Sequence, residues 1–196
     1  ILVNLGLVHA KGKVNPYWDK WLDFMAGTER PLFAWYVWDQ GTGMPGNWNG
    51  RLAPSHEFIF HFARKPGQSN KWVEKKEANI TYHNPATFRE KDGGKKKIYS
   101  PATSLQSTKI SDSVIRVNRA PAQTKGNHPA TFPTQLCEYI YRCFAKMGDA
   151  VYEPFSGSGT SIIACEGFGA RCYSMEIDPE YVDIAIKRWE DYTGQK

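Results

Sequence analysis

The stretch from Tyr152 to Thr160 constrains the fold of this chain more than any other. An apolar run ends in the acid Glu153, and a proline and two glycines follow before a helical pattern begins at Thr160. Glycine lets a backbone turn sharply and stay open to a ligand, and a helix N-terminus presents unpaired N–H groups. The sequence therefore predicts a strand, a tight glycine turn and a helix that together approach a polar ligand.

A second strand pattern, residues 170–177, follows about 20 residues after the first. The acid Glu176 lies near its end, and the acid Asp178 comes directly after it. An acid at the tip of such a strand is well placed to accept hydrogen bonds from ribose hydroxyls. The succession of strand, helix (159–168), strand and helix (179–192) predicts a parallel sheet with right-handed crossovers. Together these features indicate a nucleoside cofactor at the edge of the sheet.

The rest of the chain shows weaker patterns. A helix is predicted over 15–27, with Asn15 as N-cap and Pro16 at its first position. Strand patterns cover 1–8, 31–38 and 56–63, and a further amphipathic helix is expected over 133–147. Between 64 and 126 the periodicity fades into a polar, turn-rich stretch, which we interpret as a disordered insertion or a small irregular subdomain.

Charge is distributed unevenly along the chain. Residues 64–125 carry 14 Lys or Arg and five Asp or Glu, a net charge of +9, whereas the remainder carries 11 and 15, a net charge of −4. A basic segment within a mildly acidic protein favours a phosphate-rich partner such as nucleic acid, although a solvated lysine-rich loop is the alternative. No apolar run reaches the roughly 20 residues of a membrane span.

The four cysteines lie in or beside apolar helix and strand patterns, and none forms a C-x-x-C pair. This spacing disfavours a zinc site and favours reduced, packed thiols, as in a cytoplasmic protein. With 196 residues the chain is long enough for one domain with a core. It opens without Met directly on a strand pattern, so we expect it to be part of a longer protein.

Three motifs in order resemble those of bacterial and phage DNA methyltransferases that modify an exocyclic amino group. Residues 153–160 are similar to the family's D-P-F-x-G-S-G-T cofactor motif. Residues 128–133, His-Pro-Ala-Thr-Phe-Pro, resemble the segment that precedes it, and residues 176–181 resemble the motif that follows. A single glycine motif would be weak evidence, but three different motifs in the order found in the family are a strong signal.

The N-terminal half also resembles this family. Residues 4–7, 35–38 and 54–58 are similar to strands of the family's catalytic region, which implies the subclass in which the cofactor motif comes last. The resemblance covers about 130 residues and implies an α/β, Rossmann-like methyltransferase sheet. Its parts would be catalytic-region strands (1–63), a basic target-recognition insertion (64–126) and a cofactor-binding portion (127–196).

The chain departs from the family pattern at two points. Glu153 stands where the family usually has Asp, and both side chains accept hydrogen bonds. The family's catalytic tetrapeptide, Asp/Asn/Ser-Pro-Pro-Tyr/Phe, is absent, and no Pro-Pro pair occurs anywhere in the chain. In this subclass the tetrapeptide would precede Ile1, so we expect the chain alone to bind cofactor poorly and to transfer no methyl group.

The resemblance implies methyl transfer from S-adenosylmethionine to adenine N6 or cytosine N4 in double-stranded DNA, on a base flipped out of the duplex, as in restriction–modification systems. Glu176 would hold the ribose hydroxyls, the glycine turn would approach the cofactor closely, and Thr160 would also cap the following helix. The implied cofactor-binding residues are Thr131, Pro133, Glu153, Phe155, Gly157, Ser158, Gly159, Thr160, Glu176 and Asp178. Candidates for the base pocket are Pro54, Ser55 and His56.

Each of these assignments has a structural alternative. The glycines could merely close a turn, Glu176 could be a surface acid, Asp178 could cap the last helix, and His56 could be a packed strand residue. For the whole protein, the alternative is a non-catalytic nucleic-acid-binding module with a methyltransferase-like fold. An Asp-Pro-Pro-Tyr-like motif upstream of Ile1 would favour the enzyme. A third reading is methylation of RNA or a small molecule. The sequence leaves the target base and the oligomeric state open.

Overall fold

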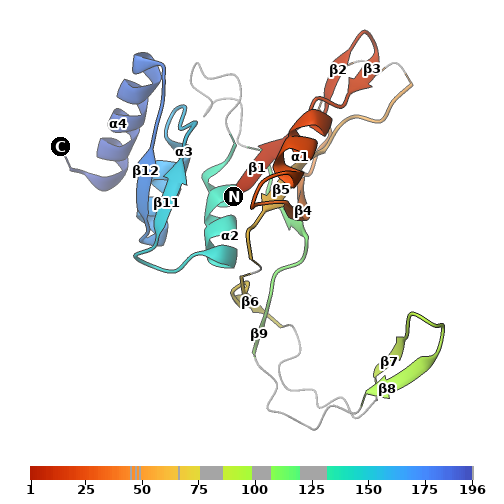
Figure 1. Cartoon of the computed structure of the whole chain (residues 1–196). Helices are drawn as coiled ribbons and strands as arrows, with labels where there is room; N and C mark the ends of the chain where they lie inside the picture. Colours follow the sequence, from red (N-terminus) through yellow and green to blue (C-terminus); the bar gives the residue numbers. More distant parts are fainter. Residues whose placement is uncertain are drawn as a thin grey trace. The chain divides into compact units, whose positions relative to one another are not determined.

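The computed structural model describes residues 1–44, 46, 48, 50–65, 67–75, 86–98, 107–119 and 132–195, with the backbone alone at 86–89 and 96–98. The chain divides into two compact units, one comprising Ile1–Asn70 with Asp112–Lys196 and the other Lys71–Ser111. The larger unit contains the glycine turn and is shown with the smaller one in Figure 1.

In the described part of the larger unit, four strands form a mixed sheet in the order β1 (Leu2–Leu5), β5 (His56–Phe62), β4 (Leu32–Asp39) and β10 (Val114–Arg116). Strand β5 is antiparallel to both of its neighbours, and β10 is parallel to β4. Aromatic and β-branched side chains dominate β4 and β5, and such side chains pack well on a pleated surface.

Helices cover both faces of this sheet. On one face Trp21 of α1 (Asp19–Ala26) contacts Phe60 and Phe62 of β5, with ring centroids 6.3 and 4.6 Å apart. On the other face Leu136 of α2 (Thr134–Phe144) packs with Trp38, Ile59 and Ile115 in a buried cluster. Side chains of β5 therefore contact helices on both faces of the sheet.

Helix α2 links this sheet to the C-terminal elements (Figure 1). Its Cys137 and Tyr141 pack with Ala164 and Cys165 of α3 (Thr160–Phe168) in a second buried cluster. Strands β11 (Ala150–Glu153) and β12 (Arg171–Ser174) pair in parallel around α3, and α4 (Pro179–Thr193) completes the chain. The predicted strand–helix–strand–helix unit with parallel pairing is confirmed.

One predicted helix start and one predicted helix cap are wrong. Helix α1 begins at Asp19 rather than near Pro16, because Asn15 belongs to β3 (Lys13–Asn15) and pairs with Val8 of β2 (Val8–Ala10). The strand expected over 1–8 accordingly splits into β1 and β2. In α3 the N-cap is Gly159, and no side chain caps the helix, so Thr160 is its first helical residue.

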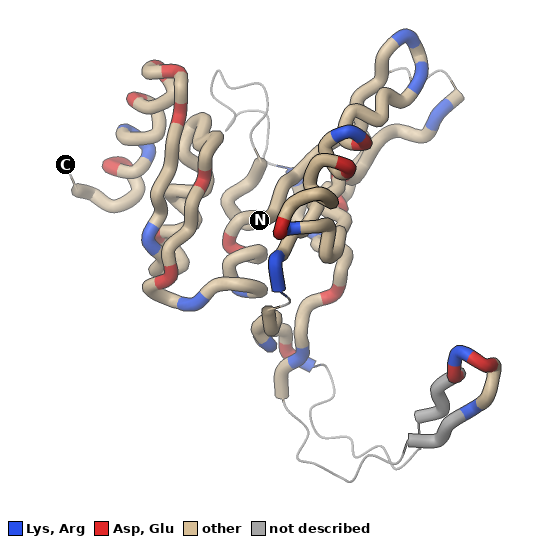
Figure 2. The backbone as a smooth tube through the Cα atoms, in the orientation of Figure 1, with Lys and Arg blue, Asp and Glu red and all other residues tan. Residues whose placement is uncertain are grey.

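The smaller unit contains two short antiparallel pairs. Strand β6 (Val73–Glu74) pairs with β9 (Thr108–Lys109), and β7 (Ala86–Arg89) pairs with β8 (Lys95–Ile98) in a hairpin. Residues 90–95 at the hairpin turn are exposed. Figure 2 shows both basic and acidic residues at this turn. This unit lies within the stretch whose periodicity fades, with narrower bounds than the expected insertion over 64–126.

The cysteines are packing residues. All four are free, and Cys137, Cys143 and Cys165 are buried. Burial raises the pKa of the Cys137 thiol to about 12, which keeps it protonated at neutral pH. Within the described ranges, no group of three or more His, Cys, Asp or Glu residues is placed to hold a metal ion. No described helix has the length and apolar character needed to cross a membrane.

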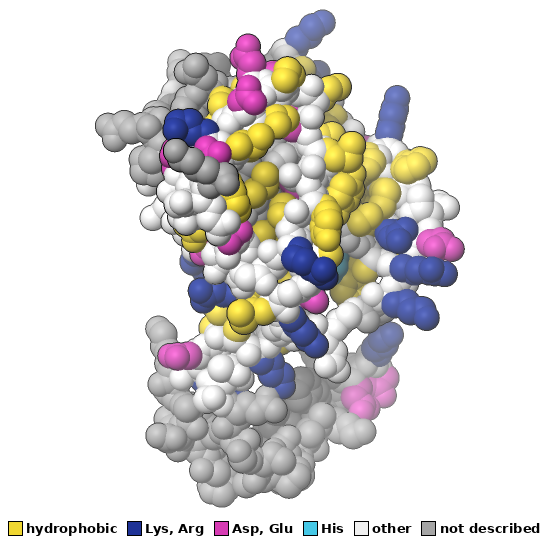
Figure 3. All heavy atoms as spheres, turned by 90° about the vertical axis from the view of Figure 1, so that its left-hand side faces the viewer, with side chains coloured by type: hydrophobic (Ala, Val, Ile, Leu, Met, Phe, Trp, Pro, Cys, Tyr) yellow, Lys and Arg dark blue, Asp and Glu magenta, His cyan; other side chains and the backbone are white. Residues whose placement is uncertain are grey.

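Large apolar side chains remain exposed on the C-terminal elements. Figure 3, which faces α4, shows hydrophobic side chains interspersed with charged ones on this side. Exposed apolar residues of the C-terminal elements include Tyr152, Phe155, Tyr173, Met175, Ile177, Val182 and Ile186. Two of them lie at the predicted cofactor edge, Phe155 within the 153–160 motif and Ile177 directly after Glu176.

Candidate cofactor site at the carboxyl ends of β11 and β12

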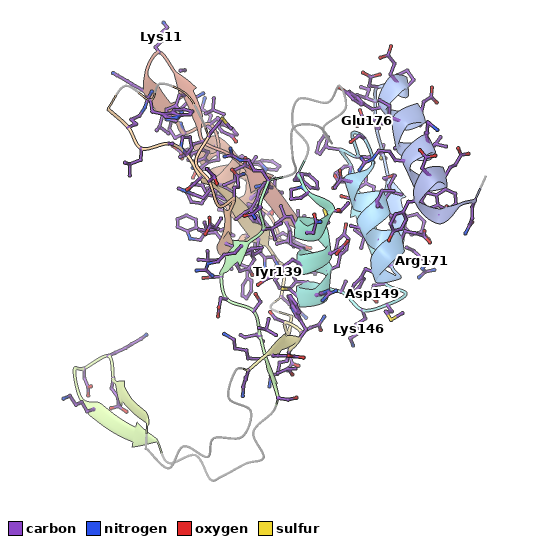
Figure 4. All side chains as sticks on the ribbon, turned by 180° about the vertical axis from the view of Figure 1, so that it is seen from behind. Lys11, Tyr139, Lys146, Asp149, Arg171 and Glu176 are labelled. Carbon is purple, nitrogen blue, oxygen red and sulfur yellow. The ribbon has the colours of Figure 1, made fainter. Side chains whose placement is uncertain are left out.

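The parallel pairing of β11 and β12 brings the two predicted motifs to one edge of the sheet. Glu153 lies opposite Ser174 in the register, so the segments that follow both strands start side by side. Backbone hydrogen bonds join them, from Met175 N–H to Glu153 O and from Ser156 N–H to Met175 O, each 2.9 Å. Figure 4 places Glu176 at this end of β12, away from Arg171 at the beginning of β12 and Asp149 just before β11.

Glu176 binds backbone on both sides of this edge. Its Oε2 accepts a hydrogen bond from Gly157 N–H at 2.6 Å, while its Oε1 accepts from the N–H groups of Ile177 and Asp178 at 2.9 and 3.1 Å. Bonds from N–H groups to a carboxylate are stronger than neutral ones. Glu176 is therefore more than a surface acid, because it ties the glycine turn to the end of β12.

Glu153 holds the turn from the end of β11. Its Oε1 accepts from Phe155 N–H at 3.0 Å, and its Oε2 accepts from the hydroxyl of Ser161 at 3.1 Å. Ser161 is buried in α3, with its Oγ 3.8 Å from Cys137 Sγ of α2. The carboxylate thus anchors the turn to the first turn of α3.

Backbone conformation favours glycine at both glycine positions of the turn, and at Gly159 close packing adds a second reason. Gly157 and Gly159 both adopt positive φ, at 52° and 79°, which favours glycine. A Cβ on Gly159 would lie 2.7 Å from the Cβ of Ala185 in α4. The missing side chain of Gly159 therefore admits α4, whereas the sequence suggested close approach of a cofactor at this position.

The other predicted cofactor residues are distributed around this edge. Ser158 and Thr160 are buried, and Phe155 is 84 % exposed. Asp178 is the N-cap of α4, and its Oδ1 accepts from Glu180 N–H at 3.0 Å, as the capping alternative expected. Pro133 is buried at the start of α2, and Thr131 lies outside the described residues.

The base-pocket candidates lie at the start of β5 in the mixed sheet. The carbonyl of Pro54 accepts from Arg119 Nη2 at 3.2 Å, and the carbonyl of Ser55 accepts from Gln40 N–H at 2.8 Å. The ring of His56 packs edge-on against Phe58, with centroids 5.4 Å apart, as a packed strand histidine would. Gln40 is buried, and its Oε1 accepts a hydrogen bond from Arg119 Nε at 2.6 Å. The sequence gives no signal for this contact, because a lone glutamine in a loop forms no pattern.

The edge has features that fit a nucleoside. Ile177 is 98 % exposed beside Glu176, and Phe155 is exposed on the other side of the turn. The buried hydroxyl of Ser156 has no hydrogen-bond partner among the described residues. The carboxylate of Glu176 stands at this edge, and a carboxylate offers up to about four lone-pair positions. Acceptor, hydroxyl and apolar side chains at one edge suit a ligand with hydroxyls and an aromatic ring.

Comparison with known proteins decides the family. Residues 4–187 match the family model N6_N4_Mtase, described as DNA methylase. The chain belongs to this family. It is 31 % identical to the type II methyltransferase M.Cfr9I of Citrobacter freundii over 160 residues, which are 79 % of this chain and 45 % of that protein. The chain thus spans less than half the length of this relative.

Solved structures confirm the fold. The PvuII DNA methyltransferase, named cytosine-N4-specific, superposes with a TM-score of 0.67 at 19 % identity, over 96 % of this chain and 62 % of that one. M1.HpyAVI in complex with SAM gives a TM-score of 0.59 at 22 % identity, over 89 % and 71 % of the two chains. The Rossmann-like methyltransferase fold and the family resemblance predicted from the sequence are both confirmed.

Proposed function

We propose that the complete protein containing this chain is a DNA methyltransferase. It transfers a methyl group from S-adenosylmethionine to the exocyclic amine of adenine (N6) or cytosine (N4). The observation that carries this proposal is the junction of the glycine turn and Glu176 at the carboxyl edge of β11 and β12, in a chain of the DNA methylase family. The names of the relatives, a type II methyltransferase and a cytosine-N4-specific enzyme, support the same reaction.

We assign the cofactor to the edge formed by the turn and the end of β12. The carboxylate of Glu176 would bind the ribose hydroxyls, and Ile177 and Phe155 would pack on the apolar parts of the nucleoside. The buried Ser156 hydroxyl would gain a polar partner there. S-adenosylmethionine supplies an activated methyl group on its sulfonium. The chain's own residues bind and orient it.

The target base would react outside the duplex, because its amine is inaccessible within the base stack. Pro54, Ser55 and His56 remain our candidates for lining its pocket. This chain contains no Pro-Pro pair. We therefore place the family's catalytic tetrapeptide elsewhere in the complete protein, in keeping with the greater length of M.Cfr9I. We also propose a cytoplasmic location, where the free cysteines stay reduced.

Ligand binding tests the cofactor assignment directly. Isothermal titration of the complete protein with S-adenosylmethionine, S-adenosylhomocysteine and ATP should give binding of the first two and none of ATP at the same concentrations. ATP lacks the amino-acid portion that a methyltransferase site accommodates. Binding of ATP in preference to S-adenosylmethionine would show that the edge serves a different nucleotide.

We propose double-stranded DNA as the partner of the basic smaller unit. Lys91 and Lys95 are exposed at the hairpin turn between β7 and β8, where they could neutralise phosphates. Each neutralised phosphate contributes about 0.9 to the slope of log affinity against log salt concentration. Such contacts position a protein on DNA without reading its sequence.

Replacing Lys91 and Lys95 together by glutamine should therefore reduce the salt slope of DNA binding by up to about 2, with the same loss on every DNA sequence. Lys187→Gln, which removes an exposed lysine paired with Asp191 on α4, is the matched control and should leave the slope unchanged. Fluorescence anisotropy with a labelled duplex between 50 and 200 mM salt measures both, a range chosen because phosphate contacts respond strongly within about these limits. An unchanged slope in the double variant would remove this hairpin from the DNA interface.

A non-catalytic DNA-binding module remains the second candidate function, because the catalytic tetrapeptide is absent from this chain. Such a module would bind DNA with the same salt dependence and transfer no methyl group. Methyl transfer by the complete protein separates the two.

A further inference from the structure

Helix α4 holds the back of the glycine turn through two residues spaced three apart. Ala185 is buried and lies against Gly159. A Cβ added to Gly159 would lie 2.7 Å from the Cβ of Ala185. Arg188 donates from Nη1 to the carbonyl of Ser158 at 2.5 Å and to its hydroxyl at 2.9 Å. Residues three apart on a helix share a face, so one face of α4 both contacts and hydrogen-bonds the turn.

The charge of Arg188 stabilises the turn through hydrogen bonds to Ser158 and gives no electrostatic stabilisation to helix α3. A cation near a helix N-terminus opposes the helix dipole, so this position offers α3 no electrostatic gain. Arg188 is about half-buried, and this burial lowers its pKa, although a guanidinium stays protonated in proteins. A partly desolvated cation needs acceptors, and the carbonyl and hydroxyl of Ser158 provide two.

Gly157, the residue before Ser158, is held by a different charged side chain. Gly157 donates its N–H to Glu176, and the next residue, Ser158, accepts from Arg188. Two consecutive residues of the turn are therefore fixed by two charged side chains from different elements. Loss of the Arg188 bonds would release Ser158 and let Gly157 N–H move relative to the carboxylate of Glu176.

We infer that Arg188 is a positioning residue of the cofactor site: it fixes the turn at Ser158 so that Gly157 and Glu176 keep the geometry that binds the nucleoside. This inference rests on the proposed function. It assigns Arg188 no contact with the cofactor. Its effect on catalysis would pass through cofactor affinity alone, since the base pocket and the DNA interface that we propose are assigned to other elements.

Arg188→Gln in the complete protein should raise the Kd and KM for S-adenosylmethionine about tenfold, the lower end of what a lost hydrogen bond to a charged group costs. The KM for DNA and kcat at saturating cofactor should stay within about twofold, because the hydrogen bonds of Arg188 are made to the turn. Arg188→Lys, which keeps one donor, should recover part of the affinity. Lys187→Gln, the neighbouring exposed lysine of α4, is the matched control and should behave as wild type.

Amide hydrogen exchange of the cofactor-free protein gives a readout independent of activity. The amides of Gly157 and Gly159, which donate to Glu176 and to Ser156 O, should exchange faster in Arg188→Gln than in Lys187→Gln. A uniform rise in exchange with a lowered Tm and unchanged cofactor affinity would show that Arg188 only stabilises the fold. If Arg188→Gln does not fold, Arg188→Lys carries the test.

The outcomes separate this inference from the proposed function. If wild-type protein binds S-adenosylmethionine and Arg188→Gln binds it equally well, the positioning role is wrong and the function stands. If wild-type protein binds no S-adenosylmethionine while amide exchange at Gly157 still depends on Arg188, then Arg188 does fix the turn and the proposed function is wrong.

Discussion

Replacing Glu176 by alanine is expected to weaken binding of S-adenosylmethionine by about 1.5–3 kcal/mol, or roughly 10- to 150-fold, the usual cost of lost hydrogen bonds to a charged group. Two effects act together. The ribose hydroxyls would lose their acceptor, and the N–H groups of Gly157, Ile177 and Asp178 would lose theirs. The glycine turn would then lose its tie to the end of β12.

Isothermal titration of the complete protein measures this loss. Glu176→Gln should fall between wild type and alanine, because it keeps one oxygen acceptor and turns an amide group toward other N–H donors. Asp183→Ala removes an exposed acid of α4 and is the matched control, with affinity expected within twofold of wild type. Unchanged affinity in Glu176→Ala would show that the ribose is bound elsewhere.

Replacing Gly159 by alanine is expected to lower the free energy of unfolding by about 2–5 kcal/mol. The left-handed conformation at φ +79° costs an L-residue about 1–2 kcal/mol. The new Cβ would lie 2.7 Å from the Cβ of Ala185, and overpacking of this kind costs about 1–3 kcal/mol. Since Ala185 Cα lies 3.2 Å from the same point, the helix backbone itself must shift.

Gly194→Ala separates the two contributions. Gly194 has nearly the same φ, +72°, but nothing lies within 4 Å of its would-be Cβ, so only the conformational cost of about 1–2 kcal/mol applies. Gly159→Ala with Ala185→Gly should recover part of the loss by removing the overlap. Urea denaturation followed by circular dichroism measures all three. Equal losses in the two single variants would mean that α4 does not press on the turn.

The sequence predicted the strand–turn–helix elements of residues 150–193 well because their signals are local. Acid, proline and glycines at fixed spacing specify a strand–turn–helix, and the periodicity of 159–168 and 179–192 marks the two helices. The structure follows these patterns closely, since α3 and α4 begin and end within two residues of their expected bounds. Asp178 caps α4, the alternative that its position before Pro179 favoured.

Other features depend on contacts between distant residues, which single-sequence patterns do not contain. The first helix begins late because Asn15 pairs with Val8 across a hairpin. Thr160 does not cap α3, because Gly159 already occupies the N-cap in a left-handed conformation. Arg188 is indistinguishable in sequence from the other charged residues of an amphipathic helix, and only its contact with Ser158 identifies it.

The stretch from 64 to 126 shows where periodicity fails as a guide. The short strand pairs β6–β9 and β7–β8 contain two to four residues per strand, too few to show a repeat. Strand β10, which joins the mixed sheet of the larger unit, also lies inside this stretch. The function of the smaller unit is therefore argued from charge rather than from pattern.

The central claim is tested most directly by incubating the complete protein with duplex DNA and S-adenosylmethionine carrying a labelled methyl group, then analysing the digested nucleosides. We expect label in N6-methyladenine or N4-methylcytosine, with none in 5-methylcytosine and none in RNA offered as competitor. Glu176→Ala should reduce the labelling at low cofactor concentration. Label confined to RNA or to a small molecule, or no transfer to DNA at saturating cofactor, would contradict the account.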